Sequence, residues 1–255
     1  MKRPLFSIIT AVKNNKDMFE RTIKSVLAQD FSDHEFIVID GGSGDGTREL
    51  LKKYADKIAY SCSEPDNGIA HAFNKGLTAA KGEYIQILNA GDIYKDENVL
   101  KRVSEDIEGS DKKIFTGISK VKGKNARLPL EDRSNSDDLA VKAHLSHQAT
   151  FVSRDVFHRY GMFSECFRIS MDYDFFLRVL KRERFEWIDK ELVLYDGGAS
   201  ADIDNWYTLK MEDLLAGFLN RENRWCNFEM LYQPVILLIK SRLVKLYKKL
   251  FVKNG

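Results

Sequence analysis

Polar and acidic side chains follow four short apolar runs in the first hundred residues, at residues 6–12, 36–39, 58–62 and 84–88. Thr10 and Ala11 stand at the end of the first run and Asn14 just after it, and the other three runs lead into segments that carry Asp40, Asp66 and Asp92. Ligands of an open parallel sheet bind beyond the carboxyl ends of its strands, so we expect these side chains to line one site. Carboxylates in such a place accept hydrogen bonds from N–H and hydroxyl groups and bind hard divalent cations.

The glycine-rich segment 40–47 (DGGSGDGT) does not have the spacing of a dinucleotide-binding loop, and it lacks the Gly-Lys-Ser/Thr of a P-loop. Its two carboxylates, Asp40 and Asp45, would repel a pyrophosphate. A carboxylate at a strand end suits a pyrimidine N–H or a ribose hydroxyl, with glycines that permit close backbone approach. The alternative is an Asx-turn that only reverses the chain, which fits Asp45 better than Asp40.

The elements that must position these residues follow from the hydrophobic pattern. The four apolar runs alternate with helix-spaced residues at 19–27, 50–54 and 68–80, which predicts a doubly wound α/β arrangement. Beyond Asp92 the pattern predicts helices at 98–107 and 173–181, strands at 113–118 and 149–152, and two short extended pieces within 186–195. The polar stretch 119–138 is typical of a hairpin and loop.

Composition limits the class of protein. A chain of 255 residues with 44% hydrophobic and 31% charged residues fits one large α/β domain or one domain plus an appendage, and not a disordered protein. The three cysteines, Cys62, Cys166 and Cys226, are far apart and form no C-x-x-C pair, which excludes a disulfide scaffold. The apolar runs near the two ends are too short or too interrupted for a signal peptide or a membrane span, so we expect neither.

Positive charge gathers near the C-terminus. The net charge is +2, but residues 1–233 hold 34 basic against 38 acidic groups, and residues 234–255 hold no acid and the cations Lys240, Arg242, Lys245, Lys248, Lys249 and Lys253. A nucleic-acid-binding domain would spread its positive charge more widely, so we expect no nucleic-acid partner. Apolar residues at 243, 246, 247 and 250 share a helix face, which predicts a basic amphipathic helix on an anionic membrane surface. The alternative is a helix docked on the protein's own core.

Several segments in order carry a resemblance to a known family: 6–11 (FSIITA), 36–43 (FIVIDGGS), 45–47 (DGT), 63–69 (SEPDNGI), 74–76 (NKG) and 88–92 (LNAGD). Together they resemble family 2 glycosyltransferases of the GT-A fold, in particular bacterial enzymes of exopolysaccharide assembly such as the colanic acid glycosyltransferases. The resemblance covers roughly residues 5–200 and is specific for fold and reaction class, not for the sugar. It implies an α/β, Rossmann-like, mainly parallel sheet flanked by helices.

The domain organisation expected from this resemblance has two parts. Residues 1–204 would form the glycosyltransferase domain, with a nucleotide-sugar half at about 1–95 and an acceptor half at about 96–204. Residues 205–255 would form a C-terminal helical extension that is basic and amphipathic.

The resemblance also implies roles for individual residues. Nucleotide-binding positions of the family match Thr10, Asp40, Ser43, Asp66 and Lys75. The family's D-x-D metal motif falls on residues 89–92, where this chain has Asn89-Ala-Gly-Asp92 in place of the Asp-Ala-Asp-Asp of many relatives. Asp92 remains as one charged ligand, which with phosphate oxygens and water can complete the shell of Mg²⁺ or Mn²⁺. The alternative role for Asp92 is to cap a following helix.

On the acceptor side, residues 170–178 (SMDYDFFLR) resemble the family's acidic segment, in which Asp172 matches the catalytic base. Its place at a helix start favours the ionised carboxylate that a base requires. The alternative is a helix cap, and Asp174 fits a structural role better. His147 and Gln148 match a motif that lines the same cleft, with a satisfied core histidine as the alternative. Residues 195–200 match a loop near the donor diphosphate.

The expected function is an inverting transfer of a sugar from a nucleotide-sugar donor, a UDP-sugar, to a saccharide acceptor carried on a lipid in bacterial surface polysaccharide synthesis. The enzyme would be cytoplasmic and peripheral on the inner face of the cell membrane. Two alternatives stay open. A sugar-phosphate nucleotidyltransferase would need a basic glycine-rich loop near the N-terminus, where this chain offers only Lys13, and a non-catalytic binding subunit would fit the reduced metal motif.

Overall fold

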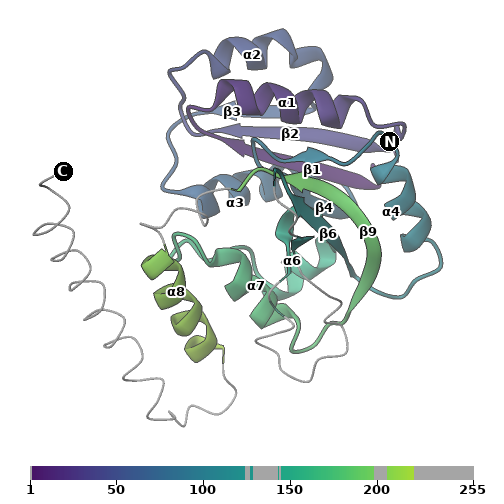
Figure 1. Ribbon diagram of the computed structural model, residues 1–255, viewed down its shortest axis with the longest axis vertical. Coiled ribbons are helices and arrows are strands. Elements are labelled where there is room, and N and C mark those ends of the chain that lie inside the picture. Colours follow the sequence, from purple (N-terminus) through teal and green to yellow (C-terminus); the bar gives the residue numbers. More distant parts are fainter. Residues whose placement is uncertain (1, 124–126, 129–142, 144, 198–205, 221–255) are drawn as a thin grey trace, which may run out of the picture.

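The computed structural model describes residues 2–123, 127–128, 143, 145–197 and 206–220 (Figure 1). These residues form one nine-stranded sheet flanked by helices. The strands are β1 (Phe6–Val12), β2 (His34–Asp40), β3 (Tyr60–Ser63), β4 (Tyr84–Ile87), β5 (Ile93–Tyr94), β6 (Ile114–Val121), β7 (Arg127–Leu128), β8 (Thr150–Ser153) and β9 (Phe185–Tyr195). The helices are α1 (Lys16–Leu27), α2 (Thr47–Lys53), α3 (Ile69–Ala79), α4 (Val99–Ile107), α6 (Arg154–Tyr160), α7 (Met171–Val179) and α8 (Trp206–Leu219), with 3₁₀ turns η1 (Ala55–Lys57) and η2 (His147–Ala149).

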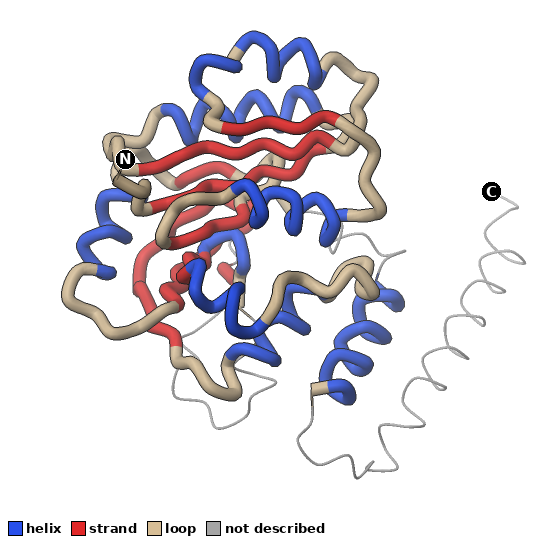
Figure 2. The backbone as a smooth tube through the Cα atoms, turned by 180° about the vertical axis from the view of Figure 1, so that it is seen from behind, coloured by secondary structure: helices blue, strands red, loops and turns tan. Residues whose placement is uncertain are grey.

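The first half of the sheet is parallel, in the order β3-β2-β1-β4. Strands β1, β2 and β4 are mostly apolar because helices cover both faces of the sheet there (Figure 2), whereas β3, at the edge, is polar and largely exposed. Alternate residues of one strand go to different sides: Ile9 packs with Phe73 of α3, and Ile8 packs with Phe19 of α1. The doubly wound arrangement predicted from the alternation of runs and helices is therefore confirmed for this half.

The second half is mixed. Antiparallel β8 joins β4 to β6, and β6 pairs in parallel with β9 and antiparallel with β7. The long strand β9 curves across the sheet (Figure 1), and its end pairs with β5, which follows directly after Asp92. This pairing brings the residues after β4 next to the residues after β9, although about a hundred residues separate them in the sequence.

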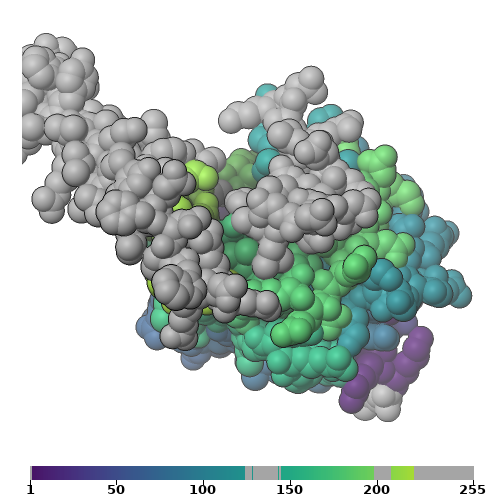
Figure 3. Space-filling model, turned by 90° about the horizontal axis from the view of Figure 1, so that it is seen from below, coloured from purple at the N-terminus to yellow at the C-terminus, as the bar shows by residue number. Residues whose placement is uncertain are grey.

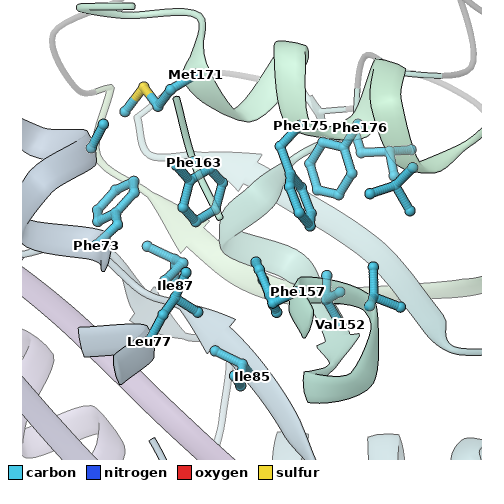
Figure 4. Close-up of a cluster of buried hydrophobic side chains, with 14 of the residues drawn as sticks. Phe73, Leu77, Ile85, Ile87, Val152, Phe157, Phe163, Met171, Phe175 and Phe176 are labelled. Atoms are coloured by element: carbon cyan, nitrogen blue, oxygen red, sulfur yellow. The ribbon is translucent and has the colours of Figure 1, made fainter. Parts of the chain in front are cut away.

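A cluster of aromatic and aliphatic side chains holds α6 and α7 against the sheet. Figure 4 shows Phe73, Phe157, Phe163 and Phe175 directed toward one another between α3, α6 and α7. The rings of Phe157 and Phe175 stack with centroids 4.7 Å apart, and Phe163 lies 5.1 Å from Phe175. Aromatic pairs of this kind contribute roughly 0.5–1.5 kcal/mol beyond their buried area. The cluster therefore holds the buried face of α7 against the sheet.

Most predicted elements are confirmed within a few residues, and the differences have local causes. The extended region 186–195 was expected as two pieces and is one strand, because register shifts around Gly117 of β6 let β9 stay paired through its polar middle. Helix α6 was not predicted; it is short and its sequence offers only two adjacent buried apolar residues, Val156 and Phe157. The hairpin expected after residue 119 is present as β6–β7. The rest of the expected loop, residues 129–138, lies outside the described residues.

Helix α8 belongs to the segment expected as a C-terminal extension, and it packs on α7. Ala216 is fully buried, and Asn220 Nδ2 donates a hydrogen bond to Asp174 Oδ1 at 2.9 Å. The view from below places the yellow-green atoms of α8 beside the green surface of the second half of the chain (Figure 3). The predicted basic amphipathic helix lies outside the described residues. Within the described ranges, no helix combines the length and the apolar character needed to cross a bilayer.

Candidate active site

The carboxyl ends of the four parallel strands meet at one edge, as the sequence predicts. Backbone hydrogen bonds join the segments that leave them: Gly41 N donates to Val12 O at 2.9 Å, Glu64 N to Asp40 O at 3.0 Å, and Ala90 N to Ala11 O at 3.3 Å. The residues after β1, β2, β3 and β4 are therefore neighbours, and the polar side chains that they carry lie along the same edge of the sheet.

Asp40, at the end of β2, is fully buried and used by the protein itself. Its carboxylate accepts hydrogen bonds from the Ser43 backbone N–H at 3.1 Å, the Ser43 hydroxyl at 2.5 Å and the Ser63 hydroxyl at 2.5 Å. It thereby closes the glycine-rich turn and ties it to β3. Asp40 organises the loop, and its predicted contact with a nucleoside stays a prediction.

Two other predicted nucleotide-binding side chains point into the protein. Thr10 is fully buried and donates to the carbonyl of Leu88 at 2.6 Å. Ser43 is 3% exposed, and its hydroxyl accepts from the backbone N–H of Asn14 at 2.7 Å. Asp45 accepts from the N–H of Thr47 at 3.1 Å, so the Asx-turn alternative is correct for that residue. These side chains set the shape of the strand ends rather than lining an open cavity.

Asp66 and Lys75 lie next to the same turn. A Cβ on Gly41 would overlap Oδ2 of Asp66, so the absence of a side chain there lets the two segments touch. Lys75 Nζ pairs with Glu64 Oε1 at 2.8 Å and donates to Pro65 O at 3.3 Å, and the hydrogen bond to Glu64 raises the pKa of Lys75. Asp40, Ser43, Asp66 and Lys75 thus gather around the ends of β2 and β3; we call them the β2–β3 group.

A pocket of about 580 Å³ adjoins the β2–β3 group. Its lining includes Asn15, which follows β1, and Ile69, which begins α3, and it contains the predicted metal, base and cleft residues: Asp92, Asp172, His147 and Gln148. The predicted nucleotide residues are not part of its lining. The structure therefore brings together the metal, base and cleft residues in one cavity, and it places the β2–β3 group beside this cavity.

His147 links two walls of the pocket. Its Nδ1 lies 2.7 Å from Asp172 Oδ2, and its Nε2 lies 3.2 Å from Asn89 Nδ2. Asn89 Nδ2 can only donate, so this arrangement fits a neutral imidazole that accepts at Nε2 and donates from Nδ1 to the carboxylate. The side chain of His147 is 16% exposed, and its ring lies 6.1 Å from that of Phe73. The histidine is thus a positioned cleft residue, not only part of the core.

Asp172 lies in the first turn of α7 and is largely buried. Burial by itself would raise the pKa of Asp172, but the hydrogen bonds from His147 and from the backbone N–H of Tyr173, the latter at 2.9 Å, outweigh it and lower the pKa below its usual value. The carboxylate is therefore ionised at neutral pH. A buried, oriented and ionised carboxylate has the properties of a general base.

Gln148 is 7% exposed and is held on both sides. Its side-chain oxygen accepts from the Ser146 hydroxyl at 2.8 Å, and its backbone carbonyl accepts from Gln86 Nε2 at 2.6 Å. These bonds fix the turn η2 on which His147 sits. Gln148 lines the pocket while it stabilises its neighbour.

Asp92 lies across the pocket with only 3% of its surface exposed. Burial raises its pKa to about 7, against the backbone hydrogen bond from Asp196 at 3.2 Å, which lowers it. The segment that follows is strand β5, so the alternative in which Asp92 caps a helix is wrong. The pairing of β5 with β9 brings Asp196 beside Asp92. Asp196 belongs to the segment 195–200 that the resemblance matches to a loop near the donor diphosphate, but it was not predicted as a metal ligand.

The donor atoms near Asp92 suit a hard divalent cation. Asn89 Oδ1 is buried without a hydrogen-bond partner, and Asp92 and Asp196 add carboxylate oxygens. The described residues hold no group of three or more acidic, histidine or cysteine side chains arranged to bind a metal. A small number of oxygen ligands fits Mg²⁺ or Mn²⁺, because these ions complete their coordination shell with water and with phosphate oxygens of a substrate.

The last wall of the pocket comes from α8, which contributes Leu209, Lys210 and Asp213. Sequence reasoning missed these residues because it assigned the segment to an extension. Their spacing within one and a half helical turns is the signal that could have placed them on a common face.

The comparisons with known proteins agree with this geometry. Residues 7–186 match the family model "Glycosyl transferase family 2". An uncharacterized glycosyltransferase of Mycobacterium tuberculosis is 33% identical over 185 residues, which cover 69% of this chain and 68% of that protein. TuaG of Bacillus subtilis, provisionally named as a teichuronic acid biosynthesis glycosyltransferase, is 37% identical over 120 residues, 46% of this chain and 48% of that protein.

Solved structures share the fold. S. aureus TarS 1–349 in complex with UDP-GlcNAc superposes with a TM-score of 0.68 at 16% identity, over 98% of this chain and 74% of that one. The mannosyltransferase PcManGT of Pyrobaculum calidifontis, in complex with GDP-Man and Mn²⁺, gives a TM-score of 0.66 at 17% identity, over 86% of this chain and 64% of that one. The fold is that of the GT-A glycosyltransferases. The chain belongs to glycosyltransferase family 2, which favours a glycosyltransferase over the nucleotidyltransferase alternative.

Replacing His147 by Leu should raise the pKa of Asp172 above its usual value, because burial is the largest influence on it and would then be opposed only by weaker backbone hydrogen bonds such as that of Tyr173. In the wild type the lowered pKa gives stability that is present above the unfolded-state value and lost as the pH falls through the folded-state value. In the variant the sign reverses, and stability falls as the pH rises above about 4. Carboxyl ¹³C NMR titration and urea unfolding at several pH values measure both effects. His158→Leu, on the exposed side of α6, is the control; an unchanged Asp172 pKa in His147→Leu would contradict the assignment.

Proposed function

We propose that the protein transfers a sugar from a UDP-sugar to a saccharide hydroxyl with inversion at the anomeric carbon. The observation that carries the proposal is the carboxylate of Asp172, hydrogen-bonded to His147 in a pocket that also contains Asp92. An inverting transfer needs one base on the acceptor side and charge compensation at the leaving diphosphate. Asp172 and Asp92 line the same cavity and suit these two tasks.

The proposed reaction is a single displacement. The acceptor hydroxyl oxygen forms a bond to the anomeric carbon, the bond from that carbon to the diphosphate oxygen breaks, and the hydroxyl proton goes to Asp172. His147 and the Tyr173 N–H each use one carboxylate oxygen, and further lone pairs remain for the acceptor. Asp92, with Asp196 and Asn89, would hold a divalent cation. Such an ion would stabilise the negative charge on the leaving diphosphate.

The uridine preference rests on the strand-end carboxylates and on similarity of fold. Asp66 lies beside the turn of Asp40, where a carboxylate can accept a base N–H or a ribose hydroxyl. TarS was solved with UDP-GlcNAc, whereas PcManGT was solved with GDP-Man.

A panel of UDP- and GDP-sugars with Mn²⁺ tests which nucleotide the protein uses. Hydrolysis of a UDP-sugar is expected. No hydrolysis of any donor would favour the non-catalytic binding subunit.

Asp172→Asn should reduce transfer by roughly 100- to 10,000-fold, because the amide cannot accept the hydroxyl proton. Donor affinity should stay nearly unchanged, since the side chain keeps its size. Initial rates with saturating donor and calorimetric titration with UDP measure the two quantities. The control is Asp155→Asn, a half-exposed carboxylate in the first turn of α6 that pairs with Lys113 and does not line the pocket. Loss of donor binding in Asp172→Asn would assign this carboxylate to the donor instead.

Asp92→Ala should remove the stimulation of donor hydrolysis by Mn²⁺, because the cation would lose its charged protein ligand. The measurement is the hydrolysis rate over a range of Mn²⁺ concentrations. Asp96→Ala, whose carboxylate pairs with Arg102 at the surface, is the control and should keep the stimulation. If Asp92→Ala keeps it as well, the cation is bound elsewhere.

We propose further that the acceptor is lipid-linked and that the basic C-terminal residues bring the enzyme to the inner face of the cell membrane. Each cation near an anionic lipid surface contributes about 1 kcal/mol. Changing Lys240, Arg242, Lys245, Lys248, Lys249 and Lys253 to Gln should release the protein from vesicles that contain anionic lipid. Vesicle flotation with and without phosphatidylglycerol measures this, and equal binding of both proteins would refute the membrane proposal.

A further inference from the structure

The carboxylate of Glu212, on α8, binds the backbone that leads into α7. Its Oε1 accepts from the N–H of Arg168 at 2.8 Å, and its Oε2 accepts from the N–H groups of Ile169 at 2.7 Å and Ser170 at 2.9 Å. Three consecutive backbone donors thus converge on one side chain more than forty residues later in the sequence. None of these donors is part of a helix or strand ladder, so without Glu212 each would need another partner.

The contact of Glu212 lies at the N-terminus of α7, close to Asp172. Ser170 is the residue before the first turn of α7, and Asp172 is two residues further along. A carboxylate at a helix N-terminus interacts favourably with the partial positive charge of the free N–H groups there. Glu212 therefore defines where α7 begins and in which direction its first turn faces.

Two further hydrogen bonds also connect α7 and the residue before it to α8 and the residue after it. The Ser170 hydroxyl donates to Asp213 Oδ1 at 2.7 Å, and Asn220 donates to Asp174 at 2.9 Å. The aromatic cluster of Figure 4 holds the buried face of α7, but apolar packing has little directional preference. The bonds from α8 are directional, so they fix the rotation and axial position that packing leaves adjustable.

We propose that Glu212 is a positioning residue for the base of the transfer reaction, and that α8 belongs to the active site. It holds residues 168–170 so that Asp172 stays within 2.7 Å of His147 and faces the pocket. The same helix supplies Leu209, Lys210 and Asp213 to the pocket wall. The inference rests on the proposed role of Asp172, but the contact itself can be tested without any activity.

The experiment compares Glu212→Gln and Glu212→Ala with the wild-type full chain. The matched control is Glu183→Gln; Glu183 lies beyond the other end of α7 and accepts from the Tyr160 hydroxyl at 2.9 Å. Hydrogen exchange of the amides of residues 168–170 should become at least ~10-fold faster in Glu212→Ala, and less so in Glu212→Gln, which keeps one acceptor oxygen. The control should leave these amides protected.

Kinetics provide the second readout. We expect kcat to fall roughly 10- to 100-fold in Glu212→Ala, because small displacements of a reacting group cost that much. KM for the donor should change less than kcat, because Glu212 contacts the segment before Asp172 and not the segments that carry Asp92 and the β2–β3 group. Glu183→Gln should change neither quantity, even if it lowers the melting temperature.

Each outcome is decisive. Unchanged exchange at residues 168–170 would refute the contact, and faster exchange with unchanged kcat would refute the positioning role. An unfolded Glu212→Gln protein would also refute it, because the proposal confines the effect to one segment. Faster exchange in a protein whose wild type transfers no sugar would leave the contact in place and refute the proposed function instead.

Discussion

The hydrogen bond between His147 and Asp172 is the interaction on which the arrangement of the site depends. Asp172 comes from α7, His147 from the turn before β8, and Asn89, the other partner of the imidazole, from the segment after β4. The three side chains join the parallel half of the sheet to the half that follows it. Burial raises the pKa of Asp172, and the hydrogen bonds from the imidazole and from the Tyr173 N–H outweigh this effect and lower it. The bond between His147 and Asp172 therefore connects the segments from the two halves of the sheet and favours the ionised form of the Asp172 carboxylate.

The asparagine at position 89 fits this arrangement better than an aspartate would. A neutral imidazole that donates to Asp172 presents a lone pair at Nε2, and only a donor such as the Asn89 amide can meet it. A carboxylate in this place would instead favour an imidazolium between two negative charges. The asparagine in the segment that resembles the family's D-x-D motif thus has a local physical reason, because its amide matches the imidazole tautomer that donates to Asp172.

The edge of the sheet where ligands bind could be predicted from the sequence. The roles of the individual side chains along that edge could be predicted less well. Continuous apolar runs identify β1, β2 and β4 because buried parallel strands need them, and polar residues after each run mark the ligand edge. The same signal does not tell a side chain that contacts ligand from one that shapes the loop, as Thr10, Ser43 and Asp40 show by their burial. The contacts of Asp196 with Asp92 and of Glu212 with residues 168–170 were not predicted, because the partners are about a hundred and about forty residues apart in the sequence. Only the β5–β9 pairing and the packing of α8 on α7 bring them into place.

The charge of the pocket constrains how a donor can bind. Among the described residues, Asp92, Asp172, Asp196 and Asp213 line it, together with the cations Arg168 and Lys210. A nucleotide diphosphate would add negative charge to a cavity that already holds an excess of carboxylates, and like charges at short range in a partly desolvated site are unfavourable. Two changes can offset this: a proton on Asp92, which its raised pKa of about 7 permits, or a divalent cation among the oxygens of Asp92, Asp196 and Asn89. A cation compensates more charge than a proton and also contacts the diphosphate, so the acidity of this pocket favours binding of donor and metal together over binding of either alone.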